Sequence, residues 1–150
     1  MINRGGIHKR GEVDFCNLLQ RLRDTTKSTD VGAIACFIGV VRGSTKTGKK
    51  VKKLEIEAWD EKAEEVLTSI CNKLSRRKGI SEVYIHHIVG ALGIGEDIVY
   101  VIVAGAHRRE VFSTLKEAVE RYKKEAPLWK KELLETGETY WVSEGGEVEE

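Results

Sequence analysis

The sequence has little that would specify a disulfide-bonded or metal-binding protein. Its three cysteines, Cys16, Cys36 and Cys71, are odd in number and widely spaced, with no CxxC pair and no histidine at ligand spacing. We therefore expect a reduced protein in the cytoplasm. Because Cys36 and Cys71 lie within apolar patterns, we predict that both are buried as small hydrophobic residues rather than reactive thiols.

The sequence also lacks an excess of charge and a long apolar run. Lysine and arginine number 25 against 24 aspartate and glutamate, so the formal charge of +1 creates no overall field that would attract nucleic acid or a membrane. The longest apolar run, residues 33–41, is interrupted by Gly39 and is much shorter than a bilayer span. The first residues lack the apolar core of a signal peptide. We expect no membrane segment, and any basic site must be local.

What is present is ordinary globular chemistry. The 150 residues are 41% hydrophobic and 33% charged, which is enough for one domain with a substantial core. We expect this domain to cover residues 1–142. Residues 143–150, SEGGEVEE, are acidic and nearly free of apolar side chains, so we predict a flexible tail there.

Apolar spacing predicts three helices and several strands. The first helix follows the capping residue Asp14 and ends near Arg23, the second runs from Asp60 to a stop at Gly79, and the third covers residues 108–125. The order of helices and strands predicts an α+β fold rather than a doubly wound sheet. The predicted strands cover residues 32–41, largely buried, then 54–58, 83–88 and 98–104, with a turn at 90–97 and a final hairpin within 128–142.

One local feature that could carry chemistry is the segment 105–109, GAHRR. It lies where a predicted buried strand meets the N-terminus of the third helix. Free backbone amides and the positive end of the helix dipole suit a phosphate or carboxylate there, and His107 and Arg108 would add donors. The alternative is that these basic residues are simply exposed in a first helical turn.

The second feature is the segment 123–131, KKEAPLWKK. Four lysines flank Pro127, the only proline of the chain, at the point where the third helix must stop. A lysine crowded by other cations loses its proton more readily, which suits a general acid, a general base or a nucleophile near neutral pH. The alternative is a solvated surface with salt bridges to Glu125 and Glu132.

Two further features have simpler interpretations. The lysines of residues 46–53 could bind nucleic acid, but no aromatic residue lies between them to stack on a base. Their pattern therefore favours a solvated loop. His86 and His87 are adjacent on a predicted strand, so they point to opposite faces and cannot easily share a metal.

Several segments together resemble a known protein family. They are GAIACFIGVVR, which ends at Arg42, LEIEAW, IHHIVGALGIGED, AGAHRREVF, and YKKEAPLWKKE followed by WV at residues 141–142. These segments resemble the MoaE family, the large catalytic subunit of molybdopterin synthase. The resemblance covers residues from about 30 to 142, and the combination of AHR with KKEAPLWKK is highly specific.

The resemblance implies a fold, a reaction and partners. The fold would be an α/β hammerhead with an additional antiparallel β subdomain, and the protein would form a homodimer. Each subunit would bind a small ubiquitin-like, MoaD-like sulfur carrier, giving a heterotetramer. The carrier's C-terminal thiocarboxylate would supply sulfur to cyclic pyranopterin monophosphate, precursor Z, to form the molybdopterin dithiolene of the molybdenum cofactor. No metal or other cofactor is expected in this sulfurtransferase.

The resemblance also implies roles for five residues. Arg42, His107 and Arg108 would bind the anionic pterin substrate, and Lys123 and Lys130 would be catalytic. Because Lys123 follows Arg108 by fifteen positions on one helix, the two lie roughly 22 Å apart along its axis. If all five residues serve one pocket, His107 and Arg108 must come from the neighbouring subunit.

Two other functions are compatible with the residues alone. A noncatalytic RNA- or nucleotide-binding module could use the basic segment 46–53, and its binding would weaken with salt. A Schiff-base enzyme could use one of the lysines near Pro127, and borohydride would trap its adduct with a carbonyl substrate.

Overall fold

Strand β4 (Ile80–Gly93) is the centre of the fold because it pairs with three other strands. It pairs antiparallel with β5 (Asp97–Gly105) through residues 80–87, parallel with β1 (Gly5–Lys9) through 85–89, and antiparallel with β3 (Val51–Ala58) through 90–93. The antiparallel partner changes next to Gly90, whose φ of 108° is a conformation that glycine adopts readily. One strand therefore belongs to both parts of the sheet.

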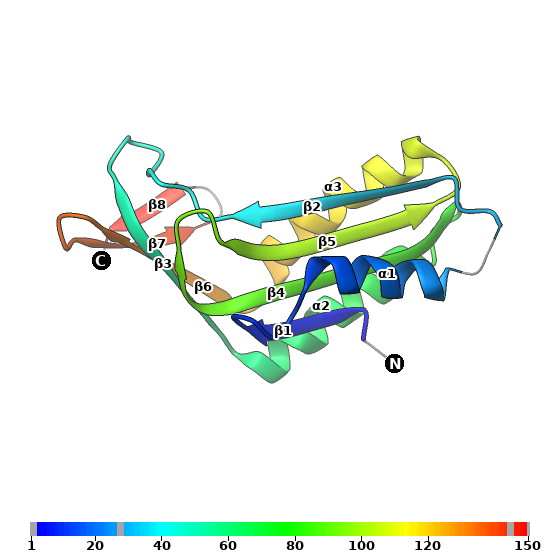
Figure 1. The fold of residues 1–150 in the computed structure, drawn as a ribbon, viewed down its shortest axis with the longest axis horizontal. Coiled ribbons are helices and arrows are strands. Elements are labelled where there is room, and N and C mark those ends of the chain that lie inside the picture. Colours follow the sequence, from blue (N-terminus) through cyan, green and yellow to red (C-terminus); the bar gives the residue numbers. More distant parts are fainter. Residues whose placement is uncertain (1–2, 27–28, 144–145, 150) are drawn as a thin grey trace.

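The computed structural model describes residues 3–26, 29–143 and 146–149. Besides β1, β3, β4 and β5, its elements are α1 (Phe15–Thr25), β2 (Ala33–Val40), α2 (Asp60–Ser75), α3 (Arg108–Glu125), β6 (Leu128–Leu134), β7 (Thr139–Ser143) and β8 (Gly146–Glu149). Within the described residues an eight-stranded sheet has the order β2-β5-β4-β3-β6-β7-β8, with β1 added beside β4. Figure 1 shows β6, β7 and β8 gathered at one end of the elongated molecule.

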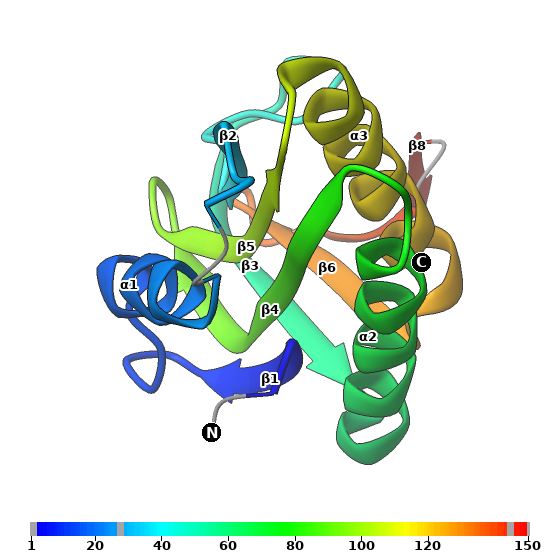
Figure 2. The same cartoon turned by 90° about the vertical axis from the view of Figure 1, so that its right-hand side faces the viewer.

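Helices lie on both sides of the central strands, which explains the burial of β5. In Figure 2, α2 and α3 lie together on one side of β4 and β5, and α1 lies on the other. Phe15 of α1 contacts Tyr100 of β5, with ring centroids 5.5 Å apart, while Val111 of α3 is buried in the core on the opposite side. Every residue of β5 after Asp97 is buried. The sequence of such a strand is a nearly continuous run of apolar residues, because neither face of the strand is in contact with water.

The helices form where the sequence predicts them, except that α2 ends at Ser75 rather than at Gly79. Asp14 caps α1, and its carboxylate accepts a hydrogen bond from the backbone N–H of Asn17 at 3.0 Å. Helix α3 has the predicted bounds, and its cap residue Ala126 has extended dihedral angles because Pro127 follows it. Together with the antiparallel pairing of β6 and β7, these elements confirm the predicted α+β fold.

Some predictions about β2 are wrong because this strand lies at the edge of the sheet. Residues 32–41 are predicted to form a largely buried strand, but Ile38 and Val40 are 38% and 44% exposed. Cys36 lies on the same exposed face, so its predicted burial is also wrong, whereas Cys71 in α2 is buried as predicted. Helix α3 packs against β2, and the alternating side chains on the other face of β2 meet solvent.

Two other differences concern strand lengths. Strand β1 was not predicted, and β4 continues to Gly93, so the predicted turn at residues 90–97 shortens to residues 94–96. In the predicted acidic tail, β8 pairs with β7, whereas residues 144, 145 and 150 lie outside the described residues. The flexibility of this tail and the domain boundary at residue 142 stay predictions.

Among the described residues, no helix has the length and apolar character to cross a membrane.

Candidate functional site

The proline segment brings Lys123 and Lys130 together from two different elements. Lys123 lies in the last turn of α3, and Lys130 is the third residue of β6. Pro127 separates the two elements, and its carbonyl accepts a hydrogen bond from the backbone N–H of Trp59 at 3.2 Å. Within the sheet, Lys130 pairs with Ile56 of β3 and with Val142 of β7. The β6 register therefore fixes the position of the Lys130 backbone against the end of α3.

The environment of Lys130 changes its proton affinity. Its side chain is half-buried, and this burial, followed by the positive charge of Lys123, lowers the pKa of Lys130 to about 8. Lys123 itself is exposed. A lysine with a pKa near 8 has appreciable amounts of both the ammonium and the amine at neutral pH, which suits general acid–base chemistry. The sequence predicted crowding by cations, and the structure adds burial as the larger cause.

A histidine that the sequence did not assign to the site belongs to the same region. His87 of β4 is fully buried, and its ring contacts Tyr122 of α3 with centroids 5.6 Å apart. Burial, then the charge of Lys130, and then that of Lys123 hold the pKa of His87 at about 3, against the opposing effect of its hydrogen bond to the Ile88 carbonyl. His87 is therefore neutral at physiological pH.

The predicted opposite orientation of His86 and His87 agrees with their contacts. His86 Nδ1 lies 2.8 Å from Nε2 of His8 on β1, whereas His87 contacts helix α3. The contact of His87 with α3 had a signal in the sequence. When a buried strand packs under a helix, one of any two adjacent strand residues must face that helix. Among the described residues, no group of three or more histidine, cysteine or acidic side chains could hold a metal ion.

His107 and Arg108 lie at the opposite end of α3 from the two lysines. His107 is the N-cap of α3, Arg108 is its first residue, and both side chains are exposed. Figure 1 shows α3 running from this end toward β6, so one chain does not bring these residues to Lys123 and Lys130. The separation inferred from helix length is thus confirmed.

Arg42 lies at the same end of the molecule as the lysines. Strand β2 runs antiparallel to β5, with Ala33 opposite Gly105 and Val40 close to Asp97. Helix α3 starts beside Gly105 and runs back along the sheet, so its C-terminus and the end of β2 lie toward one side (Figure 1). Arg42 follows β2 and is exposed. The structure therefore divides the five predicted residues into a group of three and a group of two.

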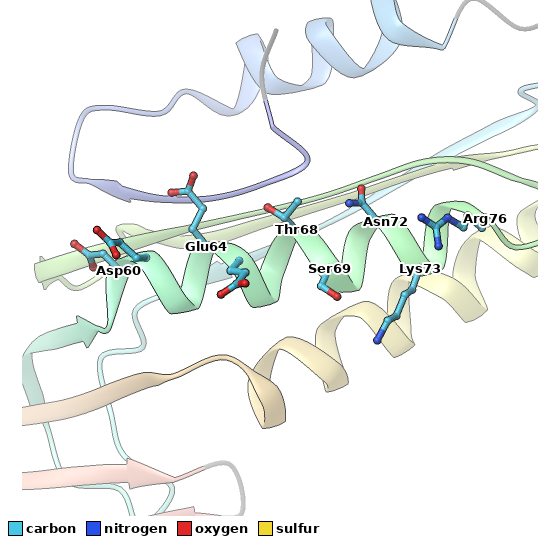
Figure 3. A pocket seen from close by; sticks show the side chains of 9 residues that line it. Asp60, Glu64, Thr68, Ser69, Asn72, Lys73 and Arg76 are labelled. Atoms are coloured by element: carbon cyan, nitrogen blue, oxygen red, sulfur yellow. The ribbon is translucent and has the colours of Figure 1, made fainter.

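An open pocket of about 710 Å³ along α2 lies apart from these residues. Figure 3 shows that its lining side chains come from α2 and from Arg76, which follows it. One end is acidic, with Asp60, Glu61 and Glu64, and none of the predicted site residues contributes to it. The acidic end would repel an anionic substrate, so we place the candidate site at Lys123 and Lys130 instead.

The basic segment 46–53 is partly engaged within the chain. Lys49 donates a hydrogen bond to the Tyr140 hydroxyl at 2.6 Å and lies over its ring, and Lys53 pairs with Glu55 at 3.1 Å. These contacts hold two of its lysines against β7 and β3. They favour a structural interpretation of this segment over the nucleic-acid alternative.

Comparisons with known proteins agree with the fold and the motifs. Residues 12–125 match the MoaE protein family. A probable molybdopterin synthase of Haloferax volcanii is 38% identical over 83% of this chain, which spans about half (48%) of that protein. A molybdopterin synthase catalytic subunit of Pyrococcus abyssi is 38% identical over 77% of this chain and 76% of its own length. The crystal structure of molybdopterin synthase from Staphylococcus aureus superposes with a TM-score of 0.80 at 30% identity, covering 95% of this chain and 99% of that one. The chain belongs to the MoaE family.

Proposed function

We propose that this protein is the catalytic subunit of a molybdopterin synthase. It transfers sulfur from the thiocarboxylated C-terminus of a small ubiquitin-like carrier to cyclic pyranopterin monophosphate, and two such transfers produce the molybdopterin dithiolene. The observation that carries this proposal is the coupled pair Lys123 and Lys130, because the lowered pKa of Lys130 gives the motif an acid–base group suited to neutral pH.

Lys130 has two proton transfers to perform for each sulfur. When the thiocarboxylate sulfur attacks a side-chain carbon of the pterin, a C–S bond forms and a C–O bond breaks, and the Lys130 ammonium protonates the departing oxygen. Water then hydrolyses the resulting thioester, the neutral Lys130 amine accepts a proton from that water, and the carrier leaves as a carboxylate. The thiol remains on the pterin, and Lys130 returns to its ammonium form. Lys123 assists by lowering the pKa of Lys130.

The cationic groups of the site suit two anionic reactants. The cyclic phosphate and the thiocarboxylate repel one another, and a pocket of cations reduces this repulsion and holds them in reacting geometry. We assign this role to Arg42, His107 and Arg108. His107 and Arg108 stand at a helix N-terminus, where the backbone amides and the dipole also favour an anion.

A homodimer would complete the site. Strand β2 is the edge of the sheet within the described residues, and its outer face exposes Ile38 and Val40. Burying this face against a second copy would remove apolar surface from water and would allow His107 and Arg108 of one subunit to approach the lysines of the other. With one carrier bound to each subunit, the assembly is a heterotetramer, and we place it in the cytoplasm.

Formation of molybdopterin from thiocarboxylated carrier and precursor Z tests this function. We expect Lys130→Ala to reduce the rate by at least about 10²-fold, the lower range for loss of a general acid–base group. Lys124→Ala is the matched control, because Lys124 is exposed in the same helical turn as Lys123 and its charge is not among the causes of the Lys130 shift. Undiminished product from the Lys130→Ala variant would overturn the role of Lys130.

A further inference from the structure

His87 carries a buried nitrogen that the mechanism above does not use. Nδ1 of His87 lies 2.9 Å from the backbone carbonyl of Ile88. A carbonyl can only accept, so Nδ1 is the protonated nitrogen, and Nε2 of the neutral ring presents a lone pair. Nε2 is buried and has no hydrogen-bond partner among the residues that the structure describes. A buried acceptor without a partner costs stability, and a catalytic role is one reason for a protein to retain it.

The surroundings of His87 identify a donor for this lone pair. Its register neighbours are Ile7 on β1 and Val99 on β5, and its ring contacts Tyr122 on α3. The charged groups that act on it are Lys130 of β6, with the larger effect, and Lys123 of α3. His86 and its partner His8 belong to the opposite face of the sheet. Across the sheet, Lys130 pairs with Ile56 of β3, and Ile56 pairs with Gly90 of β4, three positions beyond His87. We therefore assign the Lys130 ammonium as the charged donor for Nε2.

The low proton affinity of His87 limits what it can do. With a pKa of about 3, its imidazole does not take a proton from Lys130 near neutral pH. The burial that causes this leaves the ring as a fixed, neutral hydrogen-bond acceptor. Because His87 is uncharged when Lys130 titrates, it adds no like charge that would lower the pKa of Lys130.

We propose that His87 is a positioning residue for Lys130, whose ammonium donates a hydrogen bond to Nε2 in the protonated stages of the reaction. This bond directs the ammonium inward and stabilises the charged form, so that Lys130 holds its proton until the leaving oxygen needs it. The bond is lost when Lys130 becomes an amine and faces the water of the second step. The proposal rests on the proposed sulfur transfer and adds a buried residue to its machinery.

Two substitutions at His87 separate this role from simple packing. In His87→Asn, the shorter amide can still donate to the Ile88 carbonyl but places no acceptor at the position of Nε2. In His87→Gln, the longer amide can place its oxygen there. We expect the pKa of Lys130 to fall by about one unit in the Asn variant and to return most of the way in the Gln variant, because a hydrogen bond to the ammonium raises the pKa.

The pKa of Lys130 can be measured without any sulfur transfer. NMR titration of the full chain carrying ¹³Cε-labelled lysine, with the Lys130 signal assigned from a Lys130→Arg variant, gives it directly. His86→Asn is the matched control, since it alters an adjacent buried histidine on the other face and should leave the Lys130 pKa unchanged. If His87→Asn does not fold, His87→Leu fills the space without an acceptor and should produce the same fall.

The two proposals fail in different ways. An unchanged or raised Lys130 pKa in folded His87→Asn or His87→Leu would overturn the positioning role, even if the protein forms molybdopterin. Absence of molybdopterin from the unmodified protein would overturn the function and leave the pKa measurement valid. In the working enzyme, the pH profile of sulfur transfer should shift by the same amount as the measured pKa, a shift that a purely structural role for His87 would not produce.

Discussion

Lys123 and Lys130 belong to different elements, the end of a helix and the start of a strand, yet the charge of Lys123 lowers the pKa of Lys130. Seven positions separate them in sequence, with Pro127 between. The proline ends α3, and the following strand returns along the sheet, which holds two like charges close to one another. The fold therefore maintains a repulsion that an anionic reactant would relieve.

Removing the charge of Lys123 should raise the pKa of Lys130. Like charge disfavours the ammonium, so Lys123→Met favours it, although burial continues to hold the pKa below its ordinary value. We expect a rise of about half a unit, measured by lysine NMR titration, and a matching shift of the pH profile toward higher pH. Lys124→Met should cause no such rise, and a fall in the pKa of Lys130 with Lys123→Met would contradict the coupling.

Subunit mixing tests whether the site is shared between two copies. Neither Arg108→Ala nor Lys130→Ala alone should form molybdopterin efficiently, but a mixed dimer of the two retains one intact site. With random exchange of equal amounts, half of the dimers are mixed, so we expect about a quarter of the unmodified activity. Mixing His107→Ala with Arg108→Ala is the control, since both changes remove substrate-binding groups from the same half-site and no rescue should occur. A lack of rescue in the first mixture, despite verified subunit exchange, counts against a composite site.

The buried histidine should make the free energy of unfolding depend on pH. The pKa of His87 is about 3 in the folded protein against 6.5 in the unfolded chain, so the unfolded state binds more protons between these values. The contribution of His87 to the free energy of unfolding is therefore fully present above pH 6.5. It is lost as the pH falls toward 3, at about 1.4 kcal/mol per pH unit.

Urea unfolding between pH 6.5 and 4.5 measures this slope. This window lies at or above the ordinary carboxylate range, so histidines dominate the change. His87→Gln removes one titrating group and should flatten the dependence by about 1.4 kcal/mol per pH unit. An unaltered slope in the folded Gln variant would show that His87 titrates normally.

Close packing at Gly5 predicts a sensitive position in β1. A Cβ on Gly5 would meet the backbone N of Thr68 and would lie 2.7 Å from the carbonyl carbon of Leu67, both in α2. Because helix backbone cannot give way as a side chain can, Gly5→Ala should destabilise the protein by about 1–3 kcal/mol in urea unfolding. Gly43→Ala, whose Cβ would meet only side-chain atoms of Ile94 at 3.6 Å or more, should change stability by less than about 0.5 kcal/mol.

Helices could be predicted from the sequence because their signals are local. Spacing of apolar residues, the cap at Asp14 and the stop at Pro127 all act within a few positions. Strand β1 could not be found this way, since its five residues gain their place by pairing in parallel with β4, about eighty positions away. The exposure of Cys36 likewise depends on β2 lying at a sheet edge, which its own apolar pattern does not reveal.

The difference between local signals and long-range contacts also decides which parts of the candidate site could be predicted. The two cationic segments were visible because both are contiguous, and helix length was enough to place them apart. The burial of Lys130 and its effect on His87 depend on how β6 and β4 are arranged in the sheet, which joins residues more than forty positions apart. Spacing within one segment contains no information about such a contact.

The shared strand β4 has a consequence for how the protein reaches its folded state. Residues 80–87 of β4 pair with β5, and residues 90–93 of β4 pair with β3. Formation of either part of the sheet therefore positions β4 for pairing in the other part. Among the strands that the structure describes, the β3–β6 pair that carries Lys130 joins the central sheet through β4. Folding of the two parts is therefore expected to be one cooperative transition, and the reactive lysine acquires its low proton affinity only when the whole chain has assembled around it.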